Sequence, residues 1–210
     1  MARPAFGADV ALLMIDIQND FCPGGALAVA DGDAVVPVVN GLQERFSVKV
    51  ATQDWHPADH SSFAANHPGH DPFTPIDMPY GPQVLWPVHC VQGSPGAEFH
   101  SGLGMTGVDL IIRKGFRAPI DSYSAFFEND KTTQTGLAGY LRERGVGHVV
   151  LTGLATDFCV YYSAIDAVSQ GFGATLLTDA CRAIDLDGSL AAAMADMQAK
   201  GVRITTSGEI

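Results

Sequence analysis

The sequence of 210 residues carries 23 acidic residues against 12 Lys and Arg, a formal net charge of −11, and 47% of it is hydrophobic. This acidity weighs against nucleic acid or an anionic membrane surface as a partner, and no apolar run reaches the roughly 18 residues of a membrane span. The length suits one domain, so residues 1–210 are predicted to fold as a single unit with a full-sized core.

Six continuous apolar stretches predict strands that are buried on both faces of a parallel sheet. They span residues 10–17, 47–52, 108–113, 148–152, 173–178 and 201–205. Between them, amphipathic or capped stretches predict helices over residues 33–46, 133–144, 156–170 and 187–200, and three of these stretches end at a glycine. Alternating strands and helices predict a doubly wound α/β fold whose ligands bind at the carboxyl ends of the strands.

The segment between the second and third predicted strands is rich in histidine and proline. Six of the seven histidines and eight of the twelve prolines lie within residues 56–100. Side chains there that suit Zn²⁺, Fe²⁺ or Mn²⁺ are Asp54, His56 and His89, with His60 as a further candidate. We expect a metal-binding excursion over about residues 54–105. The alternative is a polar loop whose histidines cap turns or face solvent.

Reactive side chains follow three predicted strands and are expected to meet at one crevice: Asp16 after the first, Lys114 after the third and Cys159 after the fourth. Near the start of a helix capped by Thr156 or Asp157, Cys159 is expected to favour the thiolate and to act as a nucleophile. Asp16 would accept the thiol proton, and the Lys114 ammonium would balance the charge. A structural Asp–Lys ion pair is the alternative.

The other cysteines, Cys22, Cys90 and Cys181, are widely spaced and form no CxxC pair. We expect them to be buried free thiols, because free cysteine is among the most buried residue types. Such thiols, and an N-terminal stretch that reads as a strand instead of a secretory signal, predict a cytoplasmic protein.

Five motifs occur in order over most of the chain, from Ala11 to about Ala183. They are DIQNDFCPGGAL (residues 16–27), TQDWHPADHSSF (52–63), LWPVHCVQGSPGAEFH (85–100), IIRKG (111–115) and TGLATDFCV (152–160). Together they resemble nicotinamidase/pyrazinamidase, an amidohydrolase family of the isochorismatase-like (cysteine hydrolase) superfamily. The resemblance implies a three-layer sandwich in which helices flank a six-stranded parallel sheet.

The same resemblance implies roles for individual residues. The implied catalytic residues are Asp16, Lys114 and Cys159. The resemblance implies that one divalent metal ion is bound by Asp54, His56 and His89, with His60, Ser62 or water as a further ligand. Zn²⁺ is the expected ion, and Fe²⁺ or Mn²⁺ are the alternatives. The implied substrate-binding residues are the aromatic Phe21, Trp86 and Tyr123, and Leu154 and Ala155, whose cis peptide would form an oxyanion hole with the Cys159 N–H.

The implied activity is hydrolysis of nicotinamide to nicotinate and ammonia, and of pyrazinamide, through a Cys159 thioester. The metal would orient the substrate ring or activate water, and homo-oligomerisation is left open. One alternative function is that of a related cysteine amidohydrolase acting on a carbamoyl amide. The presence of the predicted metal ligands Asp54, His56 and His89 argues against this alternative. Others are a metal-dependent hydrolase without covalent catalysis and a non-catalytic metal- or ligand-binding module, which would be expected to have lost one of the three catalytic residues.

Overall fold

The computed structural model describes residues 5–210 and contains a six-stranded parallel sheet with the strand order β5-β2-β1-β6-β7-β8. All six predicted strands are present. They are β1 (Val10–Ile15), β2 (Val48–Asp54), β5 (Leu110–Lys114), β6 (His148–Leu154), β7 (Gly173–Arg182) and β8 (Arg203–Thr205). The predicted doubly wound α/β class is confirmed.

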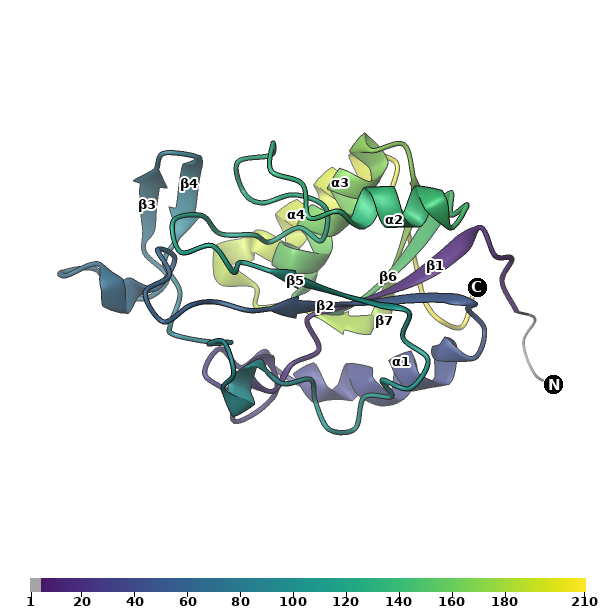
Figure 1. Ribbon diagram of the computed structural model, residues 1–210, viewed down its shortest axis with the longest axis horizontal. Coiled ribbons are helices and arrows are strands. Elements are labelled where there is room, and N and C mark those ends of the chain that lie inside the picture. The colour runs from purple at the N-terminus through teal and green to yellow at the C-terminus, as the bar shows by residue number, and fades with distance from the viewer. Residues whose placement is uncertain (1–4) are drawn as a thin grey trace.

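Helices cover both faces of the sheet (Figure 1). On one face lies α1 (Val35–Gln43), and on the other lie α2 (Leu137–Glu143), α3 (Tyr161–Ser169) and α4 (Ser189–Ala199). All four begin later than predicted, and a short helical turn directly precedes α1, α3 and α4. The short helical turns span Asn19–Phe21, Gly32–Ala34, Ala64–Asn66, Thr156–Val160, Pro95–Ala97 and Leu186–Gly188, and Thr156–Val160 is π-helical.

The β1 strand shows why its apolar run is continuous. Leu12 and Met14 pack into the core on the α1 face, whereas Leu13 and Ile15 pack into the core against α2 and α3. Both faces of the sheet are therefore shielded from solvent, as is typical of a parallel sheet covered by helices. None of the helices within residues 5–210 is long and apolar enough to cross a membrane.

The order of the strands fixes where a site can form. From β1 the chain builds outward through β2 to β5, and it then crosses to the other side of β1 to add β6, β7 and β8. The switch point lies between β1 and β6, and the loops that leave their carboxyl ends diverge there to leave a crevice. Asp16 directly follows β1, and Cys159 lies five residues beyond Leu154, the end of β6.

Between β2 and β5, the chain forms a feature that the apolar pattern did not predict. β3 (Pro75–Met78) and β4 (Gly81–Val84) pair as an antiparallel hairpin apart from the main sheet (Figure 1). Seven of its eight strand residues are exposed or partly exposed, and only Gln83 is buried. Short, proline-containing, mostly exposed strands lack the apolar run that marked the strands of the main sheet.

Candidate active site

The Asp16 carboxylate is fully buried where β1 ends. Asp16 has a positive φ of 47°, which turns the chain sharply away from the sheet. Thr52 on β2 holds this turn, because its hydroxyl donates to Asp16 Oδ1 at 2.6 Å and accepts from the Asp16 N–H at 3.1 Å. Burial raises the pKa of Asp16, although the nearby Lys114 ammonium opposes the shift. The carboxylate is thus a stronger base than an exposed aspartate.

Lys114, the last residue of β5, is a buried cation between two buried carboxylates. Its Nζ lies 2.7 Å from Asp16 Oδ2 and contacts Asp54 Oδ1 still more closely. Burial alone would lower the pKa of Lys114, but the charges of Asp16 and Asp54 raise it well above its usual range. The ammonium therefore stays charged and neutralises part of the carboxylate pair.

The three hydrogens of the Lys114 ammonium have three well-directed acceptors. They are the Asp54 carboxylate, the Ser122 carbonyl at 3.0 Å and Cys159 Sγ at 3.4 Å. Asp16 Oδ2 is close enough for an ion pair but accepts no well-directed hydrogen bond. One buried carboxylate oxygen therefore retains capacity to accept a proton beside the thiol.

Cys159 lies in the π-helical turn Thr156–Val160 that leads into α3, not in the first turn of an α-helix as predicted. The residue at the N-cap is Ala155, without a side-chain cap, so the prediction of Thr156 or Asp157 as the cap was wrong. The Asp157 carboxylate is occupied elsewhere, because it accepts from the N–H groups of Ile184 and Asp185.

The structure also corrects the expected ionisation of Cys159. Its side chain is only 7% exposed, and burial raises the pKa of the thiol well above its usual range. The Lys114 charge opposes this shift, and the Asp16 carboxylate reinforces it. In these surroundings the resting thiol keeps its proton, and a base beside it is required for attack.

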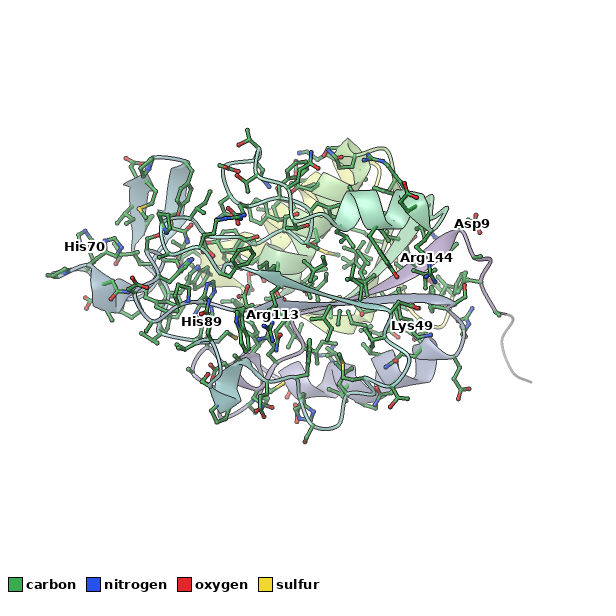
Figure 2. All side chains as sticks on the ribbon, in the orientation of Figure 1. Asp9, Lys49, His70, His89, Arg113 and Arg144 are labelled. Carbon is green, nitrogen blue, oxygen red and sulfur yellow. The ribbon has the colours of Figure 1, made fainter. Side chains whose placement is uncertain are left out.

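Three predicted metal ligands lie together at the carboxyl end of β2. Ligand atoms of Asp54, His56 and His89 all fall within 4.8 Å of one another. The two imidazole Nε2 atoms lie 3.3 Å (His56) and 3.7 Å (His89) from Asp54 Oδ2. Figure 2 shows His89 at the end of the sheet opposite Asp9, which precedes β1.

The hydrogen bonds of the two histidines leave the correct nitrogen free for a metal. His56 Nδ1 lies 2.9 Å from the Gly115 carbonyl, and His89 Nδ1 lies 2.7 Å from the Pro87 carbonyl. Because a carbonyl can only accept, each Nδ1 carries a hydrogen, which leaves Nε2 as the ring nitrogen that can bind a metal. Two imidazoles and a carboxylate in this arrangement fit a divalent cation of the Zn²⁺ type.

His60, the candidate for a further ligand, is engaged on both ring nitrogens. His60 Nε2 lies 3.1 Å from the Ile120 carbonyl, so it carries the hydrogen, and Nδ1 lies 2.7 Å from Ser62 Oγ. Its ligand atoms group with those of His56 and Asp121 instead of those of Asp54 and His89. Ser62 is fully buried behind His60. The identity of the further ligand therefore stays a prediction.

A pocket of about 330 Å³ opens beside the thiol and the metal cluster. The predicted residues that line it are Cys159, Asp54, His56, His89, Phe21, Trp86, Tyr123 and Ala155. Leu154 does not line it, because this side chain is fully buried in the core on the α1 face. The Leu154–Ala155 peptide bond is cis, as the resemblance implied.

Aromatic rings form the walls of the pocket. The ring of Phe158 lies edge-on to Trp86, with centroids 4.8 Å apart, and packs against Tyr123 with centroids 5.8 Å apart. Phe21, which also lines the pocket, contacts the His89 ring with centroids 5.5 Å apart. This apolar slot is suited to a flat ring that carries few polar groups.

Sequence reasoning missed several residues of the site. Those that line the pocket are Leu27, Asp121, Phe158 and Ile184. A signal was available for Phe158, which directly precedes the predicted nucleophile. Gln18 is also missing from the prediction, although its amide accepts from the N–H and donates to the carbonyl of Asp54, at 2.8 and 2.9 Å.

Comparisons with known proteins identify the family of the chain. The isochorismatase domain family matches residues 10–209. The chain is 54% identical to the nicotinamidase of Acinetobacter baylyi over 95% of this chain and 94% of that protein. The solved structure of an Acinetobacter baumanii nicotinamidase/pyrazinamidase is 55% identical and superposes with a TM-score of 0.96, covering 97% of this chain and 98% of that one.

A structure of the pyrazinamidase of Pyrococcus horikoshii in complex with zinc is 36% identical, with a TM-score of 0.75 over 94% of this chain and 99% of that one. The chain therefore belongs to the isochorismatase family and, within it, to the nicotinamidase/pyrazinamidase group.

Proposed function

We propose that this protein is an amidohydrolase that converts nicotinamide to nicotinate and ammonia, and that also accepts pyrazinamide. One observation carries the proposal: the Cys159 thiol, with Lys114 and Asp16 beside it, faces the same aromatic pocket as the cluster of Asp54, His56 and His89. The aromatic lining of this pocket suits a single flat ring with a carboxamide. The nicotinamidases among its relatives support this substrate.

In the first half of the reaction, Cys159 Sγ attacks the carboxamide carbon while Asp16 takes the thiol proton. The raised pKa of Asp16, caused by its burial, favours this transfer. The C–N bond then breaks as Asp16 returns the proton to the departing nitrogen. Ammonia leaves, and the acyl group remains on sulfur as a thioester.

In the second half, water attacks the thioester carbon and Asp16 takes a proton from that water. The C–S bond breaks, nicotinate leaves, and Asp16 returns the proton to the sulfur. Lys114 stabilises negative charge on sulfur throughout, because its ammonium lies 3.4 Å from Sγ. The backbone N–H groups of Ala155 and Cys159 are the proposed donors to the oxyanion, since both residues line the pocket.

The proposed metal ion is a single Zn²⁺ held by Asp54, His56 and His89, because the two free Nε2 lone pairs and one carboxylate suit it. The zinc complex of the Pyrococcus horikoshii relative supports the choice of ion. When bound, such an ion supplies Lewis acidity, which can fix a ring nitrogen of the substrate or lower the pKa of water. Phe21 and Trp86 are the proposed walls for the substrate ring.

The test is ammonia release from nicotinamide and pyrazinamide, compared with a panel of carbamoyl amides, together with metal analysis of the purified protein. We expect turnover of both heteroaromatic amides at one metal ion per chain. Higher kcat/KM for a carbamoyl amide would instead support the related carbamoyl-directed amidohydrolase. Turnover that survives complete alkylation of Cys159 would support a metal-dependent hydrolase without covalent catalysis.

A further inference from the structure

The β3–β4 hairpin contributes one buried side chain, Gln83, which lies behind the pocket wall without lining the pocket. Only 1% of Gln83 is exposed, whereas the strand residues around it are exposed or partly exposed. Burying an amide is costly unless its hydrogen-bonding groups are satisfied. Its partners therefore show what this residue does.

The partners of Gln83 fix the orientation of its amide. Nε2 lies 2.7 Å from the Val84 carbonyl and 2.8 Å from Asp121 Oδ2. Both oxygens act as acceptors here, so the NH₂ group must face them. The amide oxygen faces the other way and accepts from the Tyr80 hydroxyl at 3.2 Å and from Asn129 Nδ2 at 3.1 Å.

The same amide nitrogen lies 2.8 Å from the Tyr123 hydroxyl oxygen. An amide nitrogen cannot accept, so Tyr123 accepts at this contact, and three oxygens share two amide hydrogens. Tyr123 also accepts from Trp86 Nε1 at 3.0 Å. The Tyr123 oxygen therefore faces two donors, Gln83 Nε2 and Trp86 Nε1, and what it retains is its own hydrogen, which it can donate.

We propose that Gln83 is a positioning residue of the substrate pocket, which holds the Tyr123 hydroxyl as a pure hydrogen-bond donor and keeps the Tyr123–Trp86 wall in place for a flat heteroaromatic amide. This inference rests on the proposed amidase function and gives the hairpin a part in it. Gln83 touches neither the thiol nor the metal cluster among the interactions of the described residues. Its effect should therefore fall on substrate affinity more than on chemistry.

The first experiment compares Gln83→Met with the wild type and with Tyr80→Phe. Methionine fills the same volume without an amide, whereas Tyr80→Phe removes the hydroxyl that donates to the amide oxygen on the far side, together with its interactions with Ser61 and the Asp121 backbone. We expect Gln83→Met to raise KM for nicotinamide about three- to tenfold, the worth of one hydrogen bond, with kcat nearly unchanged. Tyr80→Phe should leave KM close to that of the wild type. An equal rise in KM for both variants would overturn the proposal.

The second experiment places Gln83→Met in a Tyr123→Phe background. If Gln83 acts through the Tyr123 hydroxyl, the substitution should have little further effect on KM once that hydroxyl is gone. Equal effects in both backgrounds would show that Gln83 acts by another route.

Gln83→Glu is the companion variant. Its carboxylate cannot donate a hydrogen bond, so the Tyr123 hydroxyl would donate to the carboxylate instead of to the substrate. KM should therefore rise at least as far as in Gln83→Met.

A readout without turnover separates this proposal from the proposed function. The chain has two tryptophans, and the indole N–H of Trp86 bonds to the Tyr123 oxygen. In Gln83→Met, the NMR resonance of the Trp86 indole N–H should shift and exchange faster with solvent, and that of Trp55 should not. If the wild type releases no ammonia, the proposed function is wrong, and the Trp86 indole resonance alone then tests whether Gln83 positions Tyr123 and Trp86. An unchanged Trp86 signal would overturn the proposal.

Discussion

Two regions of the active site, the cluster at the strand ends and the aromatic wall of the pocket, are held together by different interactions. At the ends of the sheet strands, Asp16, Lys114 and Cys159 are buried, and the first two are held by a charge pairing. In the wall formed by Trp86 and Tyr123, the groups are neutral and are held by hydrogen bonds and edge-on ring packing. Charges placed by a rigid sheet suit bond breaking, whereas a neutral aromatic wall suits recognition.

This difference predicts unequal costs of substitution. A buried charge that loses its partner is left without solvation, so such a substitution should lower both the free energy of unfolding and the rate of catalysis. A neutral hydrogen bond that is lost costs about 1 kcal/mol and leaves the fold in place. Substitutions in the two regions can therefore be ranked from the charged cluster to the pocket wall and its supports.

The largest expected effect is that of Lys114→Met. It leaves the carboxylates of Asp16 and Asp54 facing each other without a cation, so unfolding free energy should fall by about 3–5 kcal/mol and turnover by at least about a thousandfold. Urea unfolding and ammonia release measure both. Lys131→Met is the matched control, because the Lys131 side chain is 43% exposed where it pairs with Asp166, and its loss should cost at most about 1 kcal/mol. Similar losses of unfolding free energy in Lys114→Met and Lys131→Met would contradict the expected difference between the buried and the exposed ion pair.

His56→Ala should remove the metal ion while leaving the charged cluster intact. One of the two imidazole ligands is lost, so metal content should fall well below one ion per chain and substrate binding should weaken. Metal analysis after dialysis measures this, with His100→Ala as the control histidine outside the cluster. One retained metal ion per chain after His56→Ala would show that the ligand assignment is wrong.

Gly115→Ala should weaken metal binding without removing a ligand. A Cβ at this position would lie 2.3 Å from His56 Cε1, and the residue has a φ of 63°, so the imidazole would be displaced. Metal affinity should fall about 10- to 100-fold, the usual cost of disturbing the support of a ligand. A metal titration of this variant would be compared with Gly139→Ala, where the added Cβ meets nothing within 4 Å. Unchanged affinity would mean that the position of His56 does not depend on Gly115.

The smallest effect concerns pH. Because burial raises the pKa of the Cys159 thiol, the reactive thiolate should be scarce at neutral pH. In metal-free protein, the rate of iodoacetamide labelling at Cys159 should therefore keep rising as the pH passes 9. Peptide-level mass spectrometry measures the rate at this residue. A plateau below pH 8 would show instead that the thiolate is stabilised in the resting protein.

The charged cluster could be predicted from the sequence because a parallel sheet brings strand ends together. The continuous apolar run Val10–Ile15 marks its own strand, and Asp16, the residue after it, must lie at the carboxyl edge. The register then sets neighbours: Asp54 on β2 pairs with Lys114 on β5. Simple periodicity and chain order were sufficient for these residues.

The supports of the pocket wall could not be predicted in this way. Gln83 lies on a short exposed hairpin, and Asp121 lies in an irregular segment, so neither has a periodic pattern that fixes its position. The expected cap at Asp157 failed for a related reason, since its carboxylate bonds to Ile184, far along the chain. The expected Cys159 thiolate failed because burial outweighs the favourable charge nearby.

The central claim is that the sulfur of Cys159 attacks the amide, and Cys159→Ala tests it most directly. The metal ligands remain in this variant, so it should bind one metal ion per chain as the wild type is expected to do. Its rate of ammonia release from nicotinamide should be lower by at least about a thousandfold, because no thioester can form. Near-normal ammonia release at full metal content would contradict the account.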